Sequence, residues 1–306
     1  MGKIVVLTFN KEKGDKYILE ELNAVEGISA FPVLRDVNFF EKCVRRINFT
    51  LLPRHIDQWL SKTWKNQIKS DDIVICMAAF WSPTILKRIK SKFNCRCINY
   101  YWDKINVAGY PVIYDKAYEN WTFDLEDSKL YQMKYNPQFY VNDIQISNRK
   151  IKYDVMFVGA DRNGKLENRV KMANECYQRM KKMGLTTYFH LLTNSDKADR
   201  EIVRHESISM RNLLQIMRQS KSVLELVEPN EEWLTLRPFQ ALSNNVKLIT
   251  NNKKIADYDF YSQQNIFVIG EDRWEDLAKF LNSPFEYVPA LEYYSVYNWR
   301  DRFVTG

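Results

Sequence analysis

The sequence alternates short, wholly apolar runs with longer segments whose apolar residues recur at helical spacing, and this alternation limits the possible folds more than any other feature. Apolar runs without polar alternation are typical of strands that are buried on both faces of a parallel sheet. Strands that alternate with helices form βαβ units, whose helices cover both faces of the sheet. We therefore predict parallel strands at residues 4–7, 73–77, 97–101, 155–158, 188–192, 223–227, 246–250 and 266–269.

Helix signals lie between these runs. Residues 164–183 place Leu166, Val170, Ala173 and Tyr177 at spacings of three and four, which forms one apolar stripe along a helix. Further helices are expected at residues 84–92, 210–219, 274–281 and 291–304.

The chain divides best near residues 141–152, which have no apolar stripe and many turn formers. A length of 306 residues corresponds to about two domains. We predict an α/β fold of two Rossmann-like domains that face each other across a cleft, over residues 1–145 and 150–285. The aromatic-rich segment at residues 286–306 is expected to form a C-terminal helix that packs back on the first domain.

Composition excludes several classes of protein. Hydrophobic residues make up 45% of the chain and charged residues 27%, as in soluble globular proteins, so a disordered or collagen-like chain is excluded. No basic and apolar leader opens the sequence, and no apolar run approaches the roughly 20 residues that span a bilayer. The odd number of cysteines, five, favours a reducing compartment. We therefore expect a cytoplasmic protein.

In open α/β sheets, ligands bind in the crevice beyond the carboxyl ends of the strands. The strand at residues 155–158 leads into a helix through a loop that contains Gly159, Arg162 and Lys165. A glycine lets backbone N–H groups approach an anion, and a helix N-terminus adds partial positive charge. The loop therefore predicts an anion site, although a plain strand-to-helix turn would also use glycine.

The stretch after the sixth predicted strand places a cation at the start of a helix. Thr235 is suited to cap this helix, and Arg237 follows in the first turn. The helix dipole disfavours a cation there, so the sequence indicates that a bound anion offsets the penalty. Gln240 shares a face with Arg237 and could hydrogen-bond hydroxyl groups near that anion. The alternative is that Arg237 pairs with Glu231 or Glu232 at a solvated rim.

At these residues the chain resembles bacterial glycosyltransferases of the GT-B fold, which belong to lipopolysaccharide, capsule and exopolysaccharide gene clusters. The resemblance is strong over residues 150–270 and looser over residues 70–140. The matching blocks are residues 100–103 (YYWD), 154–161 (DVMFVGAD), 220–226 (SKSVLEL), 234–242 (LTLRPFQAL), 244–252 (NNVKLITNN), 259–261 (DFY) and 265–269 (NIFVI). The resemblance implies a nucleotide-sugar donor in the second domain, by family habit a UDP-sugar, and an acceptor sugar or glycolipid in the first.

Carried to this sequence, the resemblance assigns Glu232 to the donor sugar, Gln240 to the ribose hydroxyl groups and Arg237 to the diphosphate. Relatives often have two glutamates at the positions of Glu232 and Gln240, so the ribose contact here would use an uncharged amide. Trp233 stands where a glycine is frequent, which implies a reshaped donor-sugar pocket. Asp103 ends the YYWD block at the carboxyl end of a strand in the acceptor domain.

The implied reaction is hexosyl transfer to a glycan or lipid-linked acceptor in bacterial surface polysaccharide synthesis. Negative charge that builds on the diphosphate would be met by Arg237, Arg162, Lys165 and the backbone at Gly159. An inverting enzyme also needs a base for the acceptor hydroxyl, and Asp103 is the candidate. A helix or turn cap is the alternative role for Asp103.

No metal and no cofactor is expected. Cys95 and Cys97 have the wrong separation for the usual zinc site, and the three histidines are scattered without paired carboxylates. Asp257 and Asp259 form an Asp-x-Asp, the signature of manganese-dependent glycosyltransferases with a single Rossmann domain. We interpret this pair as part of a surface turn, because the preceding pattern is one that those enzymes lack.

Residues 42–69 combine basic side chains with interleaved apolar ones. Arg45, Arg46, Trp59 and Trp64 are candidates for contact with an anionic membrane or for the acceptor side of the enzyme. Such contact would place the protein at the inner face of the plasma membrane. The alternative is an amphipathic helix that packs on its own sheet and leaves a solvated basic face. We favour packing for most of the apolar residues and a peripheral membrane role for the basic ones.

Three other functions remain open. The net charge of +7 and the many aromatic residues fit a nucleic-acid-binding protein, but no nucleic-acid motif is present. Gln240 in place of a glutamate fits a non-catalytic nucleotide- or sugar-binding module. A different nucleotide-dependent enzyme, such as an epimerase, is the third, although residues 4–7 are not followed by the Gly-x-Gly-x-x-Gly of dinucleotide enzymes.

Overall fold

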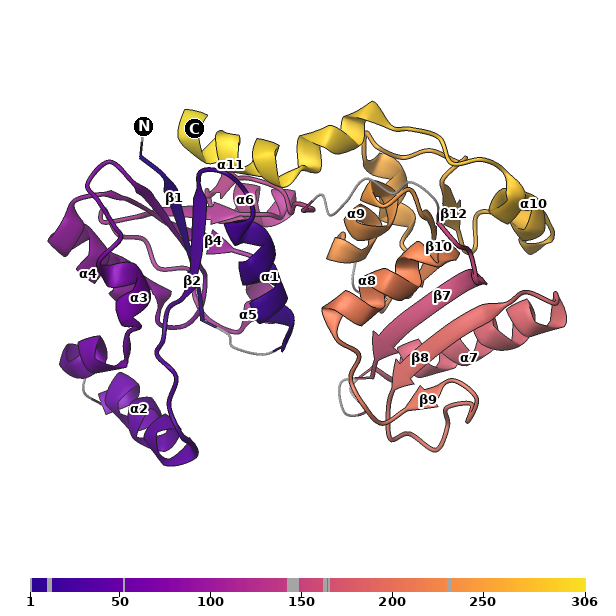
Figure 1. Ribbon diagram of the computed structural model, residues 1–306, viewed down its shortest axis with the longest axis horizontal. Coiled ribbons are helices and arrows are strands. Elements are labelled where there is room, and N and C mark those ends of the chain that lie inside the picture. Colours follow the sequence, from indigo (N-terminus) through magenta and orange to yellow (C-terminus); the bar gives the residue numbers. More distant parts are fainter. Residues whose placement is uncertain are drawn as a thin grey trace. The chain divides into compact units, whose positions relative to one another are not determined.

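The computed structural model describes residues 2–9, 13–51, 53–141, 149–161, 164, 166–229 and 233–306. The chain forms two compact units (Figure 1). Unit 1 comprises Met1–Gln138 and Val296–Gly306, and unit 2 comprises Phe139–Ser295. Most of the boundary expected at residues 145–150 falls outside the described residues.

Unit 1 is built on a six-stranded parallel sheet in the order β2-β1-β3-β4-β5-β6. The order reverses between β1 and β3, and ligands bind beyond the carboxyl ends of strands at such a reversal. The central strand β1 is buried along its whole length, as its apolar run predicts. The strands are β1 (Ile4–Thr8), β2 (Ile28–Pro32), β3 (Ile73–Met77), β4 (Arg96–Tyr101), β5 (Glu119–Thr122) and β6 (Lys134–Tyr135).

Helices and helical turns connect these strands. They are α1 (Lys13–Asn23), α2 (Phe39–Leu51), η1 (Pro53–Trp59), α3 (Lys62–Lys65), α4 (Ser82–Phe93), α5 (Ile105–Ala108) and α6 (Leu125–Leu130). In α4, Pro83 lies in the first turn, where a missing N–H costs nothing, and Asn94 ends the helix in the left-handed conformation with φ 52°. Ile85 and Leu86 of α4 pack with Val74 of β3 in the core of unit 1.

The C-terminal helix α11 (Val296–Thr305) belongs to unit 1, although all of unit 2 precedes it in the sequence. Its side chains Trp299 and Phe303 are fully buried and pack edge-to-face on Tyr100 of β4, with ring centroids 5.6 and 5.7 Å away. Asn136 donates a hydrogen bond from Nδ2 to the carbonyl of Trp299 at 3.0 Å. The helix therefore supplies part of the unit 1 core.

Unit 2 has a second six-stranded parallel sheet, in the order β12-β11-β10-β7-β8-β9. Its order reverses between β7 and β10, which places the expected ligand crevice at the carboxyl ends of these two strands. The strands are β7 (Tyr153–Ala160), β8 (Thr187–Leu192), β9 (Val203–Arg204), β10 (Ser220–Glu225), β11 (Lys247–Thr250) and β12 (Ile266–Val268).

The helical elements of unit 2 begin where the sequence provides caps. Ser209 caps α8 by accepting from the N–H of Asn212 at 3.2 Å. The stripe predicted for α7 is confirmed, since Val170 and Ala173 lie in the unit 2 core. The elements are α7 (Glu167–Lys182), α8 (Met210–Arg218), α9 (Leu236–Ser243), η2 (Lys253–Asp257), η3 (Trp274–Asp276), α10 (Leu277–Asn282) and η4 (Pro289–Tyr294).

All eight predicted strands are present, and all lie in parallel sheets. The sequence pattern missed β2, β5, β6 and β9, which are short or carry polar residues among the apolar ones. The amphipathic helix that was the alternative interpretation of residues 42–69 is divided into α2, which begins at Phe39, η1 and α3. Among the described residues, no helix has the length and apolar character that crossing a membrane requires.

Candidate functional site

Buried polar residues end three strands at the carboxyl edge of the unit 2 sheet. Asp161 follows β7 directly, Glu225 ends β10 and Thr250 ends β11, and their side chains are at most 6% exposed. Buried ionisable groups in a protein are paired, or they mark a functional site. Because β7 and β10 also flank the reversal of strand order, this edge is the candidate site.

Glu225 is at the centre of a buried hydrogen-bond network. The register of β10 and β11 sets it beside Thr250, whose Oγ1 donates to Glu225 Oε2 at 2.7 Å. Thr235 Oγ1 donates to Glu225 Oε1 at 2.5 Å. Burial raises the pKa of Glu225, although both hydroxyl groups and the positive charges of Arg237 and Arg169 oppose that rise. Glu225 was not predicted as a site residue, although a carboxylate inside the otherwise apolar run at residues 223–227 indicates a buried polar site.

The amino end of α9 carries three of the predicted site residues. Thr235 caps the helix by accepting from the N–H of Arg237 at 3.1 Å. The Arg237 guanidinium donates from Nη1 to Gln240 Oε1 at 3.2 Å, so the structure brings these two side chains together. Arg237 is half-buried; burial lowers its pKa, and the charge of Glu225 opposes this effect.

Among the described residues, the buried Glu225 is therefore the carboxyl whose charge acts on Arg237. The bound anion that the sequence predicts beside Arg237 stays a prediction, and the charge of Glu225 acts on Arg237 in addition. The alternative partners, Glu231 and Glu232, lie outside the described residues, as does the predicted donor-sugar contact of Glu232.

The raised pKa of Glu225 predicts a pH dependence of stability. A carboxyl whose pKa is higher in the folded than in the unfolded state loses stabilising effect as pH rises through its folded pKa. The Glu225→Gln variant lacks this titration, so the wild type should gain stability relative to the variant as pH falls from 7 toward the ordinary carboxyl pKa of about 4.3. Urea unfolding of both proteins at several pH values measures this difference. A difference that stays constant or shrinks with acidification would contradict the assignment.

Gly159 lies within β7, not in the loop after it, because the strand extends two residues beyond its predicted end. A Cβ at this position would come within 2.6 Å of the Phe157 ring, so packing accounts for the glycine. Gly164, with φ 81°, occupies the position in this loop that requires a left-handed residue. Arg162 and Lys165 lie outside the described residues.

Arg169, in the first turn of α7, links the ends of β7 and β10. It donates from Nη1 to the carbonyl of Ala160 at 3.3 Å and from Nε to the carbonyl of Leu226 at 3.1 Å. Glu228 accepts from the backbone N–H of Arg169 at 2.9 Å and from Asn168 Nδ2 at 3.0 Å. Neither Arg169 nor Glu228 was predicted, although a cation in a first helical turn is the signal that identified Arg237.

In unit 1, Asp103 lies just beyond the carboxyl end of β4 and is exposed. Its charge acts on Tyr110, whose pKa is raised mainly by burial and further by Asp103. The Tyr110 hydroxyl donates to the carbonyl of Ala78, which follows β3, at 2.7 Å. Thr8 ends β1 with a buried Oγ1 that has no hydrogen-bond partner among the described residues. Asp103 therefore lies at the edge of the sheet where an acceptor was expected.

Trp59 and Trp64 are 5% and 2% exposed, so the prediction that they contact a membrane or acceptor is wrong. Trp64 donates from Nε1 to the carbonyl of Val33 at 3.2 Å. Both rings pack in the unit 1 core, as the alternative interpretation expects for apolar residues of this segment. Arg45 is half-buried and Arg46 is exposed.

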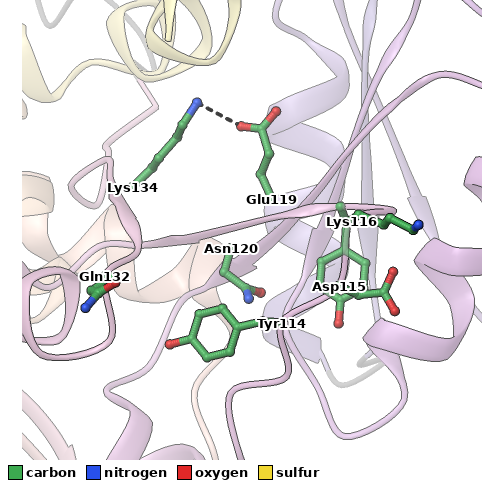
Figure 2. A pocket seen from close by; sticks show the side chains of 8 residues that line it. Tyr114, Asp115, Lys116, Glu119, Asn120, Gln132 and Lys134 are labelled. Atoms are coloured by element: carbon green, nitrogen blue, oxygen red, sulfur yellow. Dashed lines mark ion pairs between the residues drawn. The ribbon is translucent and has the colours of Figure 1, made fainter.

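An open pocket of about 460 Å³ lies in unit 1 at the amino ends of β5 and β6 (Figure 2). Tyr114 and Asn120 line it, and Lys134 contacts Glu119 at its rim with an Nζ–Oε2 distance of 3.1 Å. Burial raises the pKa of Glu119, but hydrogen bonds from Arg96, Trp121 and Lys134 outweigh it and bring the pKa to about 2. No predicted site residue lines this pocket, which is at the edge opposite to the carboxyl ends of the strands.

The part of the chain that the structure describes contains no group of three His, Cys, Asp or Glu residues arranged to hold a metal ion. His190, on β8, is nine-tenths buried and its Nε2 bonds with the carbonyl of Glu206 at 2.8 Å. Asp259 accepts from the hydroxyl of Tyr294 at 3.1 Å.

Comparison with known proteins identifies the fold through solved structures alone, since no family model and no curated protein matches the sequence. S. aureus MnaA, solved with UDP, aligns with a TM-score of 0.53 and 10% identity over 99% of this chain and 95% of its own. The N-terminal domain of Candida albicans trehalose-6-phosphate phosphatase aligns with a TM-score of 0.52 and 10% identity, over 100% and 96% of the two chains.

Both likenesses extend over nearly the whole of each chain, so they include both units. Together with the two parallel sheets, they confirm the predicted fold class, an α/β protein of two Rossmann-like units of GT-B type. At 10% identity, the likeness concerns the fold alone.

Proposed function

We propose that this protein is a glycosyltransferase that binds a nucleoside diphosphate sugar at the carboxyl edge of the unit 2 sheet. The observation that carries the proposal is Arg237, whose guanidinium is held at the amino end of α9 by a hydrogen bond to Gln240 Oε1 and feels the charge of the buried Glu225. A helix N-terminus with a positioned guanidinium matches the charge and the geometry of a pyrophosphate. The presence of UDP in the structure of MnaA, which shares this fold, supports UDP-sugar as the donor class.

The proposed chemistry follows from where charge develops. As the bond between the anomeric carbon and the diphosphate breaks, negative charge builds on the phosphate oxygens. Arg237 and the first N–H groups of α9 would stabilise that charge, with Arg162, Lys165 and the backbone near Gly159 beside them. Gln240 would contact the ribose, and Glu232 the transferred sugar.

The acceptor would bind to unit 1. Its hydroxyl oxygen forms the new bond to the anomeric carbon, and in an inverting reaction its proton passes to Asp103. We propose a glycan or lipid-linked acceptor of bacterial surface polysaccharide synthesis and a cytoplasmic location. Neither a metal nor a cofactor has a role in this mechanism, since cationic side chains and a helix terminus carry the diphosphate charge.

A thermal-shift panel of nucleoside diphosphates and their sugars, each with EDTA and with added Mn²⁺, tests the donor site. We expect UDP and at least one UDP-sugar to raise the melting temperature equally in both conditions. A stabilising donor then enters a transfer assay with lipid-linked acceptors. Release of UDP that depends on an acceptor supports transfer, whereas interconversion of the UDP-sugar without an acceptor would indicate an epimerase.

Two outcomes would contradict the proposal. Stabilisation by UDP that disappears with EDTA would show that a metal ion, not Arg237, neutralises the diphosphate. Donor binding without turnover of any acceptor or of the donor itself would leave only a binding module.

A further inference from the structure

The helix α2 exposes an apolar stripe to solvent, which is unusual for a helix of a globular unit. Phe39, Phe40 and Ile47 are 82%, 75% and 55% exposed, and Cys43 is also exposed. At 3.6 residues per turn, these four residues fall within an arc of roughly 100°. Most exposed apolar side chains are scattered singly, whereas a contiguous stripe indicates a surface that another body covers.

This stripe is not the face by which α2 packs on unit 1. Val44 packs against the unit 1 core, and Glu41 and Arg45 beside it are half-buried. Glu41 is also held by Arg35, which donates to its carboxylate at 2.8 Å. The helix is therefore attached by one face and presents a second, apolar face outward.

Basic residues border the exposed stripe. Lys42 and Arg46 are exposed and lie next to Phe39 on the helix surface. Over residues 35–65, seven Lys and Arg residues stand against three Asp and Glu residues. A second copy of this face would meet like charges, whereas an anionic lipid surface offers both opposite charge and an apolar layer.

We propose that α2 docks on an anionic lipid bilayer, with Phe39, Phe40 and Ile47 inserted at the boundary of the acyl chains and Lys42 and Arg46 on the headgroups. The placement of α2 suits this contact, because it lies beyond the carboxyl end of β2 in unit 1 (Figure 1). Docking is independent of the proposed donor site, which is in unit 2. In this proposal the exposed stripe of α2 takes the place of Trp59 and Trp64 as the apolar part of the predicted membrane contact.

Flotation with vesicles measures the docking of the full chain. Wild type should float with vesicles of phosphatidylcholine and 30% phosphatidylglycerol and bind at least tenfold less to phosphatidylcholine alone. The F39S/F40S variant should lose at least tenfold of the anionic binding, because the apolar contact is removed. The K42Q/R46Q variant should lose roughly fivefold for each charge at low salt.

A matched control comes from α6, where Leu125 and Leu130 are 51% and 73% exposed in the same unit. The L125S/L130S variant should float as wild type does. All these side chains are on the surface, so each variant should keep the wild-type melting temperature and its response to UDP.

A fluorescent label on Cys43 gives a second readout at the stripe itself, because the other four cysteines are buried. Its emission should shift to shorter wavelength only with anionic vesicles. Equal flotation of wild type and F39S/F40S, or equal loss in the α6 control, would overturn the proposal. So would a dimer in sedimentation velocity that F39S/F40S dissociates without any effect on vesicle binding, since a second copy would then cover the stripe.

Discussion

The Arg237→Ala variant is expected to bind UDP about 10- to 150-fold more weakly than the wild type. This range corresponds to a loss of roughly 1.5–3 kcal/mol, the usual contribution of a hydrogen bond to a charged group. The guanidinium is already held by a hydrogen bond to Gln240 at 3.2 Å. Little side-chain conformational entropy is therefore lost when it binds a pyrophosphate. Isothermal titration with UDP measures the change in dissociation constant.

Two further variants separate binding from stability. Arg179→Ala removes a half-exposed arginine that stacks on Trp274 in the same unit, so UDP binding should stay within twofold of the wild type. Arg237→Ala alone removes a positive charge that acts on the buried carboxylate of Glu225, so it should lower the free energy of unfolding. Adding Glu225→Gln should recover that stability but not the affinity for UDP. Wild-type affinity in Arg237→Ala would exclude the guanidinium from the donor site.

The Trp299→Ala variant is expected to destabilise unit 1 by about 3–5 kcal/mol, the usual effect of emptying a buried tryptophan site. Trp299 is fully buried and its ring lies 4.8 Å from that of Phe303 and 5.6 Å from that of Tyr100. Because the proposed donor site is in unit 2, UDP should raise the melting temperature of unit 2 alone in differential scanning calorimetry. The variant should then lower the melting temperature of the other transition, the one that UDP does not affect. Tyr297, 46% exposed on the same helix, provides the control Tyr297→Ala, which should melt as wild type does.

Two results for Trp299→Ala would contradict this prediction. If Trp299→Ala lowers only the transition that UDP raises, α11 stabilises the donor-binding unit instead. If both variants melt alike, the packing of Trp299 on β4 contributes little to stability.

The apolar runs predicted eight of the strands, the edge strand β12 among them, whereas the sequence missed the edge strands β2, β6 and β9 and the short β5. β3 is a continuous apolar run in the middle of a sheet, and β1 beside it is apolar up to Thr8, because burial on both faces imposes that composition. β2 pairs only with β1 and includes Ser29 and Pro32, while β6 and β9 have two residues each. Edge strands need fewer apolar residues because one side of the backbone is unpaired, so composition identifies them poorly.

The site was predictable where local chemistry suffices. Thr235 and Arg237 were found because capping and the helix dipole depend on neighbours in the sequence. Glu225 was missed because its partners come from elsewhere in the fold: the sheet register sets Thr250 beside it, and Thr235 reaches it from the start of α9.

The basic segment at residues 42–69 also shows that burial set by the tertiary fold cannot be predicted from neighbouring residues in the sequence. Trp59 and Trp64, proposed as membrane contacts, are buried, whereas Phe39 and Phe40, which precede this segment and were not singled out, are exposed. A sequence shows that aromatic residues alternate with basic ones, but the packing of three helical pieces on the sheet decides which of them reach solvent.

A crystal structure of the full chain with UDP tests the central claim most directly. We predict that the pyrophosphate lies at the carboxyl ends of β7 and β10, with Arg237 and the first N–H groups of α9 within hydrogen-bond distance of its oxygens. Nucleotide bound instead in the pocket at the amino ends of β5 and β6, or an Arg237 guanidinium that remains turned away from the bound diphosphate, would contradict the account.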